Sequence, residues 1–204
     1  MNKRILIRVS CISILALIAL AFAFGTERVS TQRQDFIDYA LQFRGTPYVY
    51  GGRTPEEGFD CSGYVSYVTN YGLNIQLPRT AQAIYQKVDP VTVKEREPGD
   101  LVFFKNDMSS DKVTHVGIYL GVYHGNMTQY EGKRVFISAV SDGPETGVVI
   151  RAMDENFWKT HYFASGRILP SSKEAKAAEE ASLGAEETFA DDSSLEDIPL
   201  TPEK

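Results

Sequence analysis

Residues 58–68 read Gly58-Phe59-Asp60-Cys61-Ser62-Gly63-Tyr64-Val65-Ser66-Tyr67-Val68. This stretch marks a change from loop to helix. Before Asp60 the chain is rich in glycine, proline and charged residues, which is typical of a loop. After it, apolar residues recur every three or four positions from Cys61 to Val68, which predicts a helix with Asp60 as its N-cap. The only cysteine after residue 25 is therefore predicted in the first turn of a helix.

A cysteine at the start of a helix has the chemistry of a nucleophile. The positive end of the helix dipole favours the thiolate, so the pKa of Cys61 is predicted to fall below about 8.5. The N–H of the same residue could help to bind an oxyanion. Gly51 and Gly52 allow the preceding loop to pass close to the sulfur. A thiolate nucleophile also needs a base.

Three histidines are candidates for that base. His115 begins a segment, residues 115–122, in which alternating apolar residues predict a strand with one buried face. His115 is on the other face, where glycines leave room for a second element. A hairpin that turns near Asn126 places His115 opposite Ser138 in the next strand. His124 is predicted at the hairpin tip and His161 at a helix-to-strand turn, so neither is expected in a catalytic or metal site.

The remaining pattern predicts an α+β fold. Helices are expected near Thr31–Phe43, from Cys61, near Thr80–Lys87 and near Asp154–Lys159. Antiparallel strands are expected near residues 101–105, 114–122, 134–140, 147–151 and 162–168. Helices that precede a run of strands favour α+β over a parallel sheet.

Length and charge predict one domain, residues 26–170, between two appendages. The chain has 204 residues and a net charge of −6. The predicted domain holds 15 basic and 17 acidic residues, so bulk charge indicates no nucleic-acid partner. Residues 171–204 are acidic and poor in aromatics, which predicts a disordered tail.

Residues 1–25 predict export. Lys3, Arg4 and Arg8 precede an apolar run, and small residues follow at a cleavage site. An uncleaved membrane anchor is the alternative, although the run is near the lower length limit for spanning. The expected location is the periplasm, the cell envelope or the medium, with contact to a membrane only through an uncleaved N-terminal segment.

Five motifs occur in order along the chain and together carry a resemblance. They are Pro47-Tyr48-Val49-Tyr50-Gly51-Gly52, Asp60-Cys61-Ser62-Gly63, Leu77-Pro78-Arg79-Thr80, Pro98-Gly99-Asp100-Leu101-Val102-Phe103-Phe104 and His115-Val116-Gly117-Ile118-Tyr119-Leu120-Gly121. The set resembles the NlpC family of papain-like cysteine peptidases, and within it the exported murein endopeptidases.

The resemblance implies a papain-like core, with N-terminal helices on a five-stranded antiparallel sheet. It also implies cleavage of stem peptides or cross-links in bacterial peptidoglycan, with Cys61 as nucleophile and His115 as general base. By the same resemblance Tyr48 donates its hydroxyl near the reacting carbonyl. Hydrolysis through an acyl-enzyme agrees with the chemistry expected from the residues. A monomer without metal or organic cofactor is expected.

The sequence departs from the family at Ser138, where the family usually has histidine. A serine hydroxyl can still orient His115, and Ser138→His is expected to raise turnover. Two other functions stay open: a non-catalytic peptidoglycan-binding module with a degenerate triad, and a cysteine acyltransferase on the same scaffold.

Three polar residues near the cysteine are candidates for substrate binding: Asp60, Ser62 and Arg79. Arg79 could bind a substrate carboxylate. The favoured interpretation of Arg79 is a solvated arginine or one that contacts a helix cap.

Overall fold

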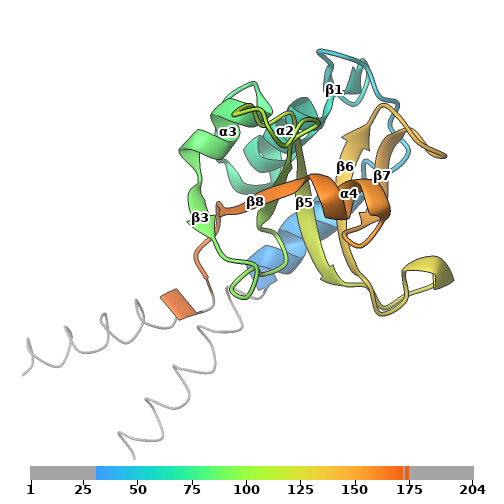
Figure 1. The fold of residues 1–204 in the computed structure, drawn as a ribbon. Coiled ribbons are helices and arrows are strands. Elements are labelled where there is room, and N and C mark those ends of the chain that lie inside the picture. The colour runs from blue at the N-terminus through green and yellow to red at the C-terminus, as the bar shows by residue number, and fades with distance from the viewer. Residues whose placement is uncertain (1–30, 172, 175–204) are drawn as a thin grey trace, which may run out of the picture. The chain divides into compact units, whose positions relative to one another are not determined.

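The computed structural model describes residues 31–171, 173 and 174. Residues 31–41 are helical, and two further helices, α2 and α3, follow before the main sheet (Figure 1). The elements after α3 are mostly strands, with one more helix, α4, before the last strand. In chain order the elements are β1 (Arg53–Thr54), β2 (Gly58–Phe59), α2 (Cys61–Leu73), α3 (Ala81–Lys87), β3 (Asp89–Val91), β4 (Leu101–Phe104), β5 (His115–Val122), the 3-10 turn η1 (Thr128–Tyr130), β6 (Arg134–Val140), β7 (Gly147–Ala152), α4 (Asn156–His161) and β8 (Tyr162–Arg167).

The main sheet has six strands in the order β3-β8-β4-β5-β6-β7, and every neighbouring pair is antiparallel. All five predicted strands are present, which confirms the α+β prediction. The predicted number of strands was wrong, because β3 adds a sixth at the edge beside β8. This strand has three residues with Pro90 at its centre. Proline cannot donate to a ladder, so it is tolerated at an edge but removes the strand signal from the sequence.

The predicted helices are present with small shifts. Asp60 and Thr80 cap α2 and α3 with side chains that accept from Gly63 and Ala83. The last helix, α4, begins two residues later than predicted and ends at His161. Helix ends are the least certain feature of a sequence pattern, since the last turns depend on tertiary contacts.

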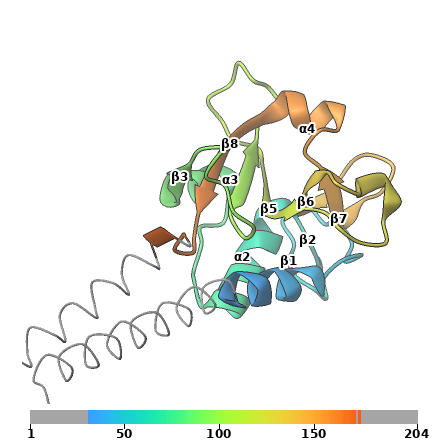
Figure 2. The same cartoon turned by 90° about the horizontal axis from the view of Figure 1, so that it is seen from below.

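Helices cover both faces of the sheet. α2 and the helix of residues 31–41 lie on one face and α4 on the other (Figure 2). The first face buries the larger core, which includes Phe36, Tyr64 and Ile84. The second buries a smaller aromatic cluster in which Phe104 and Trp158 meet edge to face, with ring centroids 4.9 Å apart. The sheet is therefore covered on both sides in the region that carries His115.

A buried carboxylate ties the first helix to the sheet. Asp100 is fully buried and accepts hydrogen bonds from Arg33 (3.2 Å), from Arg167 (2.9 and 3.1 Å) and from the N–H of Glu97 (2.8 Å). The bond from Glu97 closes the turn that precedes β4. The two arginine partners are distant in the sequence and gave no local signal.

The predicted export signal or anchor, residues 1–25, lies outside the described residues, as does nearly all of the predicted acidic tail. Within the described part of the chain, no helix is both long and apolar enough to cross a membrane. The bounds predicted for the domain, residues 26–170, stay a prediction.

Candidate active site

Cys61 is the first residue of α2 and is 9% exposed. The helix starts here because Asp60 has extended backbone angles and its Oδ1 accepts the N–H of Gly63 at 2.7 Å. This is the N-cap expected from the sequence. The thiol contacts the carbonyl oxygen of Thr114 at 3.9 Å, so the helix start lies against the strand that carries His115.

Glycines bring the preceding loop against α2. A Cβ at Gly63 would lie 2.1 Å from the carbonyl oxygen of Gly52, so no larger residue fits without a shift of the backbone. Gly51 has a φ of +81°, a conformation that glycine adopts readily, and its N–H donates to Asp60 at 3.1 Å. The loop therefore approaches the start of α2 at Cys61, as the glycine pair predicts.

Asp60 is the centre of a polar network beside the cysteine. Arg79 donates to both of its carboxylate oxygens, at 3.0 and 2.6 Å, and to the hydroxyl of Ser62 at 2.9 Å. Burial raises the pKa of Asp60, but hydrogen bonds from Arg79 and Gly63 outweigh it, and the net result is a lowered pKa. Arg79 contacts the helix cap, which was the favoured interpretation. A role of Asp60, Ser62 and Arg79 in substrate binding stays a prediction.

His115 and Ser138 meet across two neighbouring strands. Ile118 of β5 pairs with Ile137 of β6, so Ser138 reaches His115 diagonally across the position of Gly117. The distance between Ser138 Oγ and His115 Nε2 is 2.8 Å. A Cβ at Gly117 would lie 3.1 Å from Cβ of Ser138, which shows how closely the two strands approach here. The predicted contact between His115 and Ser138 is present, but the predicted register was wrong by two residues, because Gly117 and not His115 lies opposite Ser138.

The contacts of Ser138 select one tautomer of His115. Its hydroxyl is fully buried and lies 2.8 Å from both the carbonyl oxygen of Val116 and Nε2 of His115. A carbonyl only accepts, so the single hydroxyl proton goes to Val116 and Ser138 Oγ accepts from Nε2–H. The proton is then on Nε2, and Nδ1 is the free base.

Burial makes both reactive groups neutral. The pKa of Cys61 rises to about 11, mainly because burial disfavours the thiolate. The pKa of His115 falls to about 4, again because of burial, and the nearby Asp60 only partly opposes this. The predicted fall in the pKa of the thiol was wrong, because loss of water outweighs the backbone N–H groups at the helix start.

One hollow of about 610 Å³ brings the reactive groups together. Its wall includes Tyr48, Cys61 and His115. Burial raises the pKa of the Tyr48 phenol, and neighbouring Cys61 and Asp60 add to the rise, so the hydroxyl keeps its proton as a donor. We call this hollow the cleft. Its other lining residues are Asn106, Thr114, Val140, Ser141, Asp142, Gly143, Pro144, Arg151, Glu155, Phe157 and Trp158.

Trp158 was not predicted as part of the site. Its ring lies over His115, with centroids 5.0 Å apart and planes 37° apart, and it is 6% exposed. It covers the imidazole and contributes to the burial that lowers the pKa of His115. The sequence signal was a lone tryptophan in a short segment, and only the fold places it beside the histidine.

The other two histidines are elsewhere. His124 is exposed in the connection between β5 and β6 and contacts Glu131 at 2.8 Å. His161 ends α4, as predicted for a helix-to-strand turn. Among residues 31–171, 173 and 174, no group of three His, Cys, Asp or Glu side chains is placed to hold a metal ion.

An α+β fold with a thiol at a helix start and an imidazole on the adjoining strand is the arrangement of a cysteine hydrolase of the papain type. Residues 45–167 match the NlpC/P60 family. The chain belongs to this family, which is one of peptidoglycan hydrolases.

Relatives of known function are cell-wall endopeptidases and related hydrolases. The gamma-DL-glutamyl hydrolase of Bacillus subtilis is 38% identical over 152 residues, which are 72% of this chain and 32% of that protein. The murein DD-endopeptidase MepH of Escherichia coli is 36% identical over 131 residues, 63% of this chain and 43% of that protein. The chain thus matches less than half the length of each. Because these relatives are cell-wall hydrolases, the location of the family is extracytoplasmic.

Solved structures support the same fold. A lipoprotein-like member of the family from Staphylococcus aureus is 30% identical with a TM-score of 0.54, over 69% of this chain and 42% of that one. A family member from Bacillus cereus is 26% identical with a TM-score of 0.56, over 68% and 40%.

Proposed function

We propose that this protein hydrolyses peptide bonds in the stem peptides or cross-links of bacterial peptidoglycan. One observation supports this most directly: Cys61 and His115 line the same cleft, and His115 is held at Nε2 by Ser138 at 2.8 Å. Relatives that act on murein or on gamma-glutamyl bonds agree with it.

The first half of the reaction forms an acyl-enzyme. Sγ of Cys61 attacks the substrate carbonyl carbon while its proton passes to Nδ1 of His115. The N–H of Cys61 and the Tyr48 hydroxyl stabilise the oxyanion that forms. As the intermediate collapses, the C–N bond breaks and His115 returns the proton to the leaving amine. A thioester on Cys61 remains.

The second half uses water. His115 takes a proton from the water as the water oxygen attacks the thioester carbon. The C–S bond then breaks, His115 returns the proton to Sγ of Cys61, and a carboxylic acid and the free thiol result. Ser138 accepts the Nε2–H bond throughout, so it steadies the imidazolium that forms in both halves. Because the Cys61 thiol and the His115 imidazole are both neutral at rest, the proton leaves the thiol only as the bond between Sγ and the substrate carbon forms.

Digestion of purified peptidoglycan tests the proposal. The wild type, Cys61→Ala and Cys11→Ala are incubated with the polymer, and soluble products are identified by mass spectrometry. The other cysteine of the chain, Cys11, supplies a matched control, since it lies outside the predicted domain of residues 26–170. Product is expected from the wild type and Cys11→Ala and not from Cys61→Ala, and its mass identifies the bond that is cut.

Other results would favour the alternatives. Equal binding of all three proteins to the polymer without product would indicate a binding module whose triad is degenerate at Ser138. A product that carries the acyl group on an added amine or thiol, in place of a free acid, would indicate an acyltransferase.

A further inference from the structure

A second hollow lies at the other end of the strands that carry the cleft. It has a volume of about 530 Å³ and is lined by the end of β5, the start of β6 and the residues that follow β7, including Val122, Arg134 and Met153. The cleft is lined by the opposite ends of β5 and β6, at His115 and Val140. Seven steps along β5 at about 3.3 Å each place the two hollows roughly 20 Å apart.

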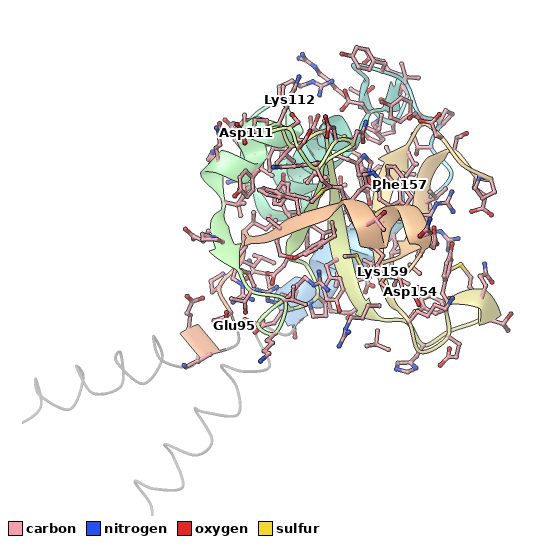
Figure 3. All side chains as sticks on the ribbon, in the orientation of Figure 1. Glu95, Asp111, Lys112, Asp154, Phe157 and Lys159 are labelled. Atoms are coloured by element: carbon pink, nitrogen blue, oxygen red, sulfur yellow. The ribbon has the colours of Figure 1, made fainter. Side chains whose placement is uncertain are left out.

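α4 separates the two hollows. Phe157 and Trp158 line the cleft, whereas Lys159 lines the second hollow. Phe157 projects from one side of α4, and Lys159 and Asp154 lie on the other (Figure 3). A ligand that fills the second hollow is therefore next to the helix that forms one wall of the cleft.

The second hollow is cationic in a chain that is acidic overall. Its lining includes four basic residues, Arg96, Lys133, Arg134 and Lys159, against a single carboxylate, Asp154. This is a local charge of about +3 in a protein of net charge −6. The hollow is therefore positively charged although the chain as a whole is negatively charged.

Three of these cations have no carboxylate partner among the residues that the structure describes. The side chains of Lys133, Arg134 and Lys159 take part in none of the ion pairs between described residues, whereas the buried Arg33 and Arg151 each contact a carboxylate. Three exposed and unpaired cations around one concavity leave a strong site for an outside anion.

Arg96 adds an independent observation. Its guanidinium lies over the ring of Tyr119, 4.2 Å from the centroid, and 5.5 Å from that of Tyr162. Its Nε is buried and has no hydrogen-bond partner, and Nη1 has only a long contact of 3.4 Å to Ser165. A buried donor without a partner is destabilising, so an anion that accepts from Arg96 would be bound favourably here.

We propose that this hollow binds a phosphodiester-linked polymer of the bacterial cell wall. Planar guanidinium groups and lysines are the usual ligands of phosphate oxygens, and several cations in one hollow match several phosphates better than one ion. Exposed Val93 and Val122, at 55% and 49%, can contact the carbon atoms between phosphates. Such a polymer, held about 20 Å from Cys61, would keep the enzyme at the wall while the cleft acts on stem peptides.

Binding of a labelled poly(glycerol phosphate) chain to the full-length protein tests this proposal by fluorescence anisotropy. The double variant Lys133→Gln/Arg134→Gln is compared with Lys87→Gln/Lys112→Gln, which removes the same charge at exposed positions elsewhere. Lys112 is seen near α3 in Figure 3. We expect the first variant to weaken binding at least tenfold, which is about 1.4 kcal/mol, because it removes two positive charges from the hollow, and to reduce the salt dependence of binding. The control should bind like the wild type.

Three results would overturn the proposal: no binding of the polymer by the wild type, equal weakening of polymer binding in both double variants, or binding of phosphatidylglycerol vesicles as tight as that of the polymer and weakened by the same double variant. The last would assign the hollow to a membrane. Cys61→Ala should bind the polymer like the wild type. Binding by that variant separates this proposal from the proposed hydrolase, since either can fail while the other holds.

Discussion

Removal of the Ser138 hydroxyl should slow the proposed reaction without weakening substrate binding. In the mechanism, His115 becomes an imidazolium in each half-reaction, and Ser138 Oγ accepts its Nε2–H at 2.8 Å. A hydrogen bond to a charged group contributes roughly 1.5–3 kcal/mol. At about 1.4 kcal/mol per factor of ten, Ser138→Ala should lower kcat by roughly 10- to 150-fold. KM should not change, because Ser138 does not line the cleft.

The assay is the initial rate of product release from purified peptidoglycan, measured over a range of substrate concentrations. Ser165→Ala is the matched control: Ser165 is also buried in the sheet, and its hydroxyl contacts Tyr162 at 2.8 Å, outside the cleft. It should lower the melting temperature about as much as Ser138→Ala and keep the wild-type kcat. An unchanged kcat in Ser138→Ala, or a loss seen only in KM, would refute the role of Ser138 as the group that orients His115.

Four further predictions follow from the geometry. Iodoacetamide should alkylate Cys61 about a hundredfold more slowly in the folded protein at pH 7.5 than in the denatured chain, as measured by peptide mapping. The reason is that burial raises the pKa of the thiol from 9.0 to about 11 and keeps it protonated until alkaline pH. The acid limb of kcat/KM against pH should lie below pH 5, since the pKa of His115 is about 4 and its neutral form persists above that value; a limb near pH 6.5 would contradict this. Asp100→Ala should lower the free energy of unfolding by about 3–5 kcal/mol in denaturant titrations, because Arg33 and Arg167 lose a fully buried partner. Ser138→His should raise turnover if a histidine holds the imidazolium better than a serine, and a marked loss would count against Ser138 as the third member of the site.

The positions of the residues proposed to carry the chemistry were predictable because local rules place them. Capping places Cys61 at a helix start, and a strand with alternating apolar residues places His115 and Ser138 on one face. Both rules act over a few residues, so they can be applied to the sequence alone. The contact of 2.8 Å between His115 and Ser138 follows from a hairpin, which is also a local structure.

What the sequence could not give depends on contacts between distant segments. Strand β3 is defined by its pairing with β8, about 75 residues later, and Pro90 hides it from the pattern. The cover over His115 is Trp158, which is 43 positions away along the chain. The sign of the shift in the pKa of Cys61 was wrong for the same reason: the helix start is local, but the burial that overrides it is tertiary.

For the proposed hydrolase, burial of the thiol has two opposed effects. It raises the pKa of Cys61 to about 11, so the resting enzyme holds almost no thiolate and each attack must move a proton to His115. The same burial slows oxidation, which follows thiolate content and exposure. Cys61 is the only cysteine in residues 26–204, so no second thiol of the predicted domain could rescue it as a disulfide. In the proposed mechanism, Cys61 and His115 are neutral at rest and ionise only when substrate is in the cleft, which protects the thiol between turnovers. The atom that accepts the proton is Nδ1 of His115, which the contacts of Ser138 with Nε2 and with Val116 leave free.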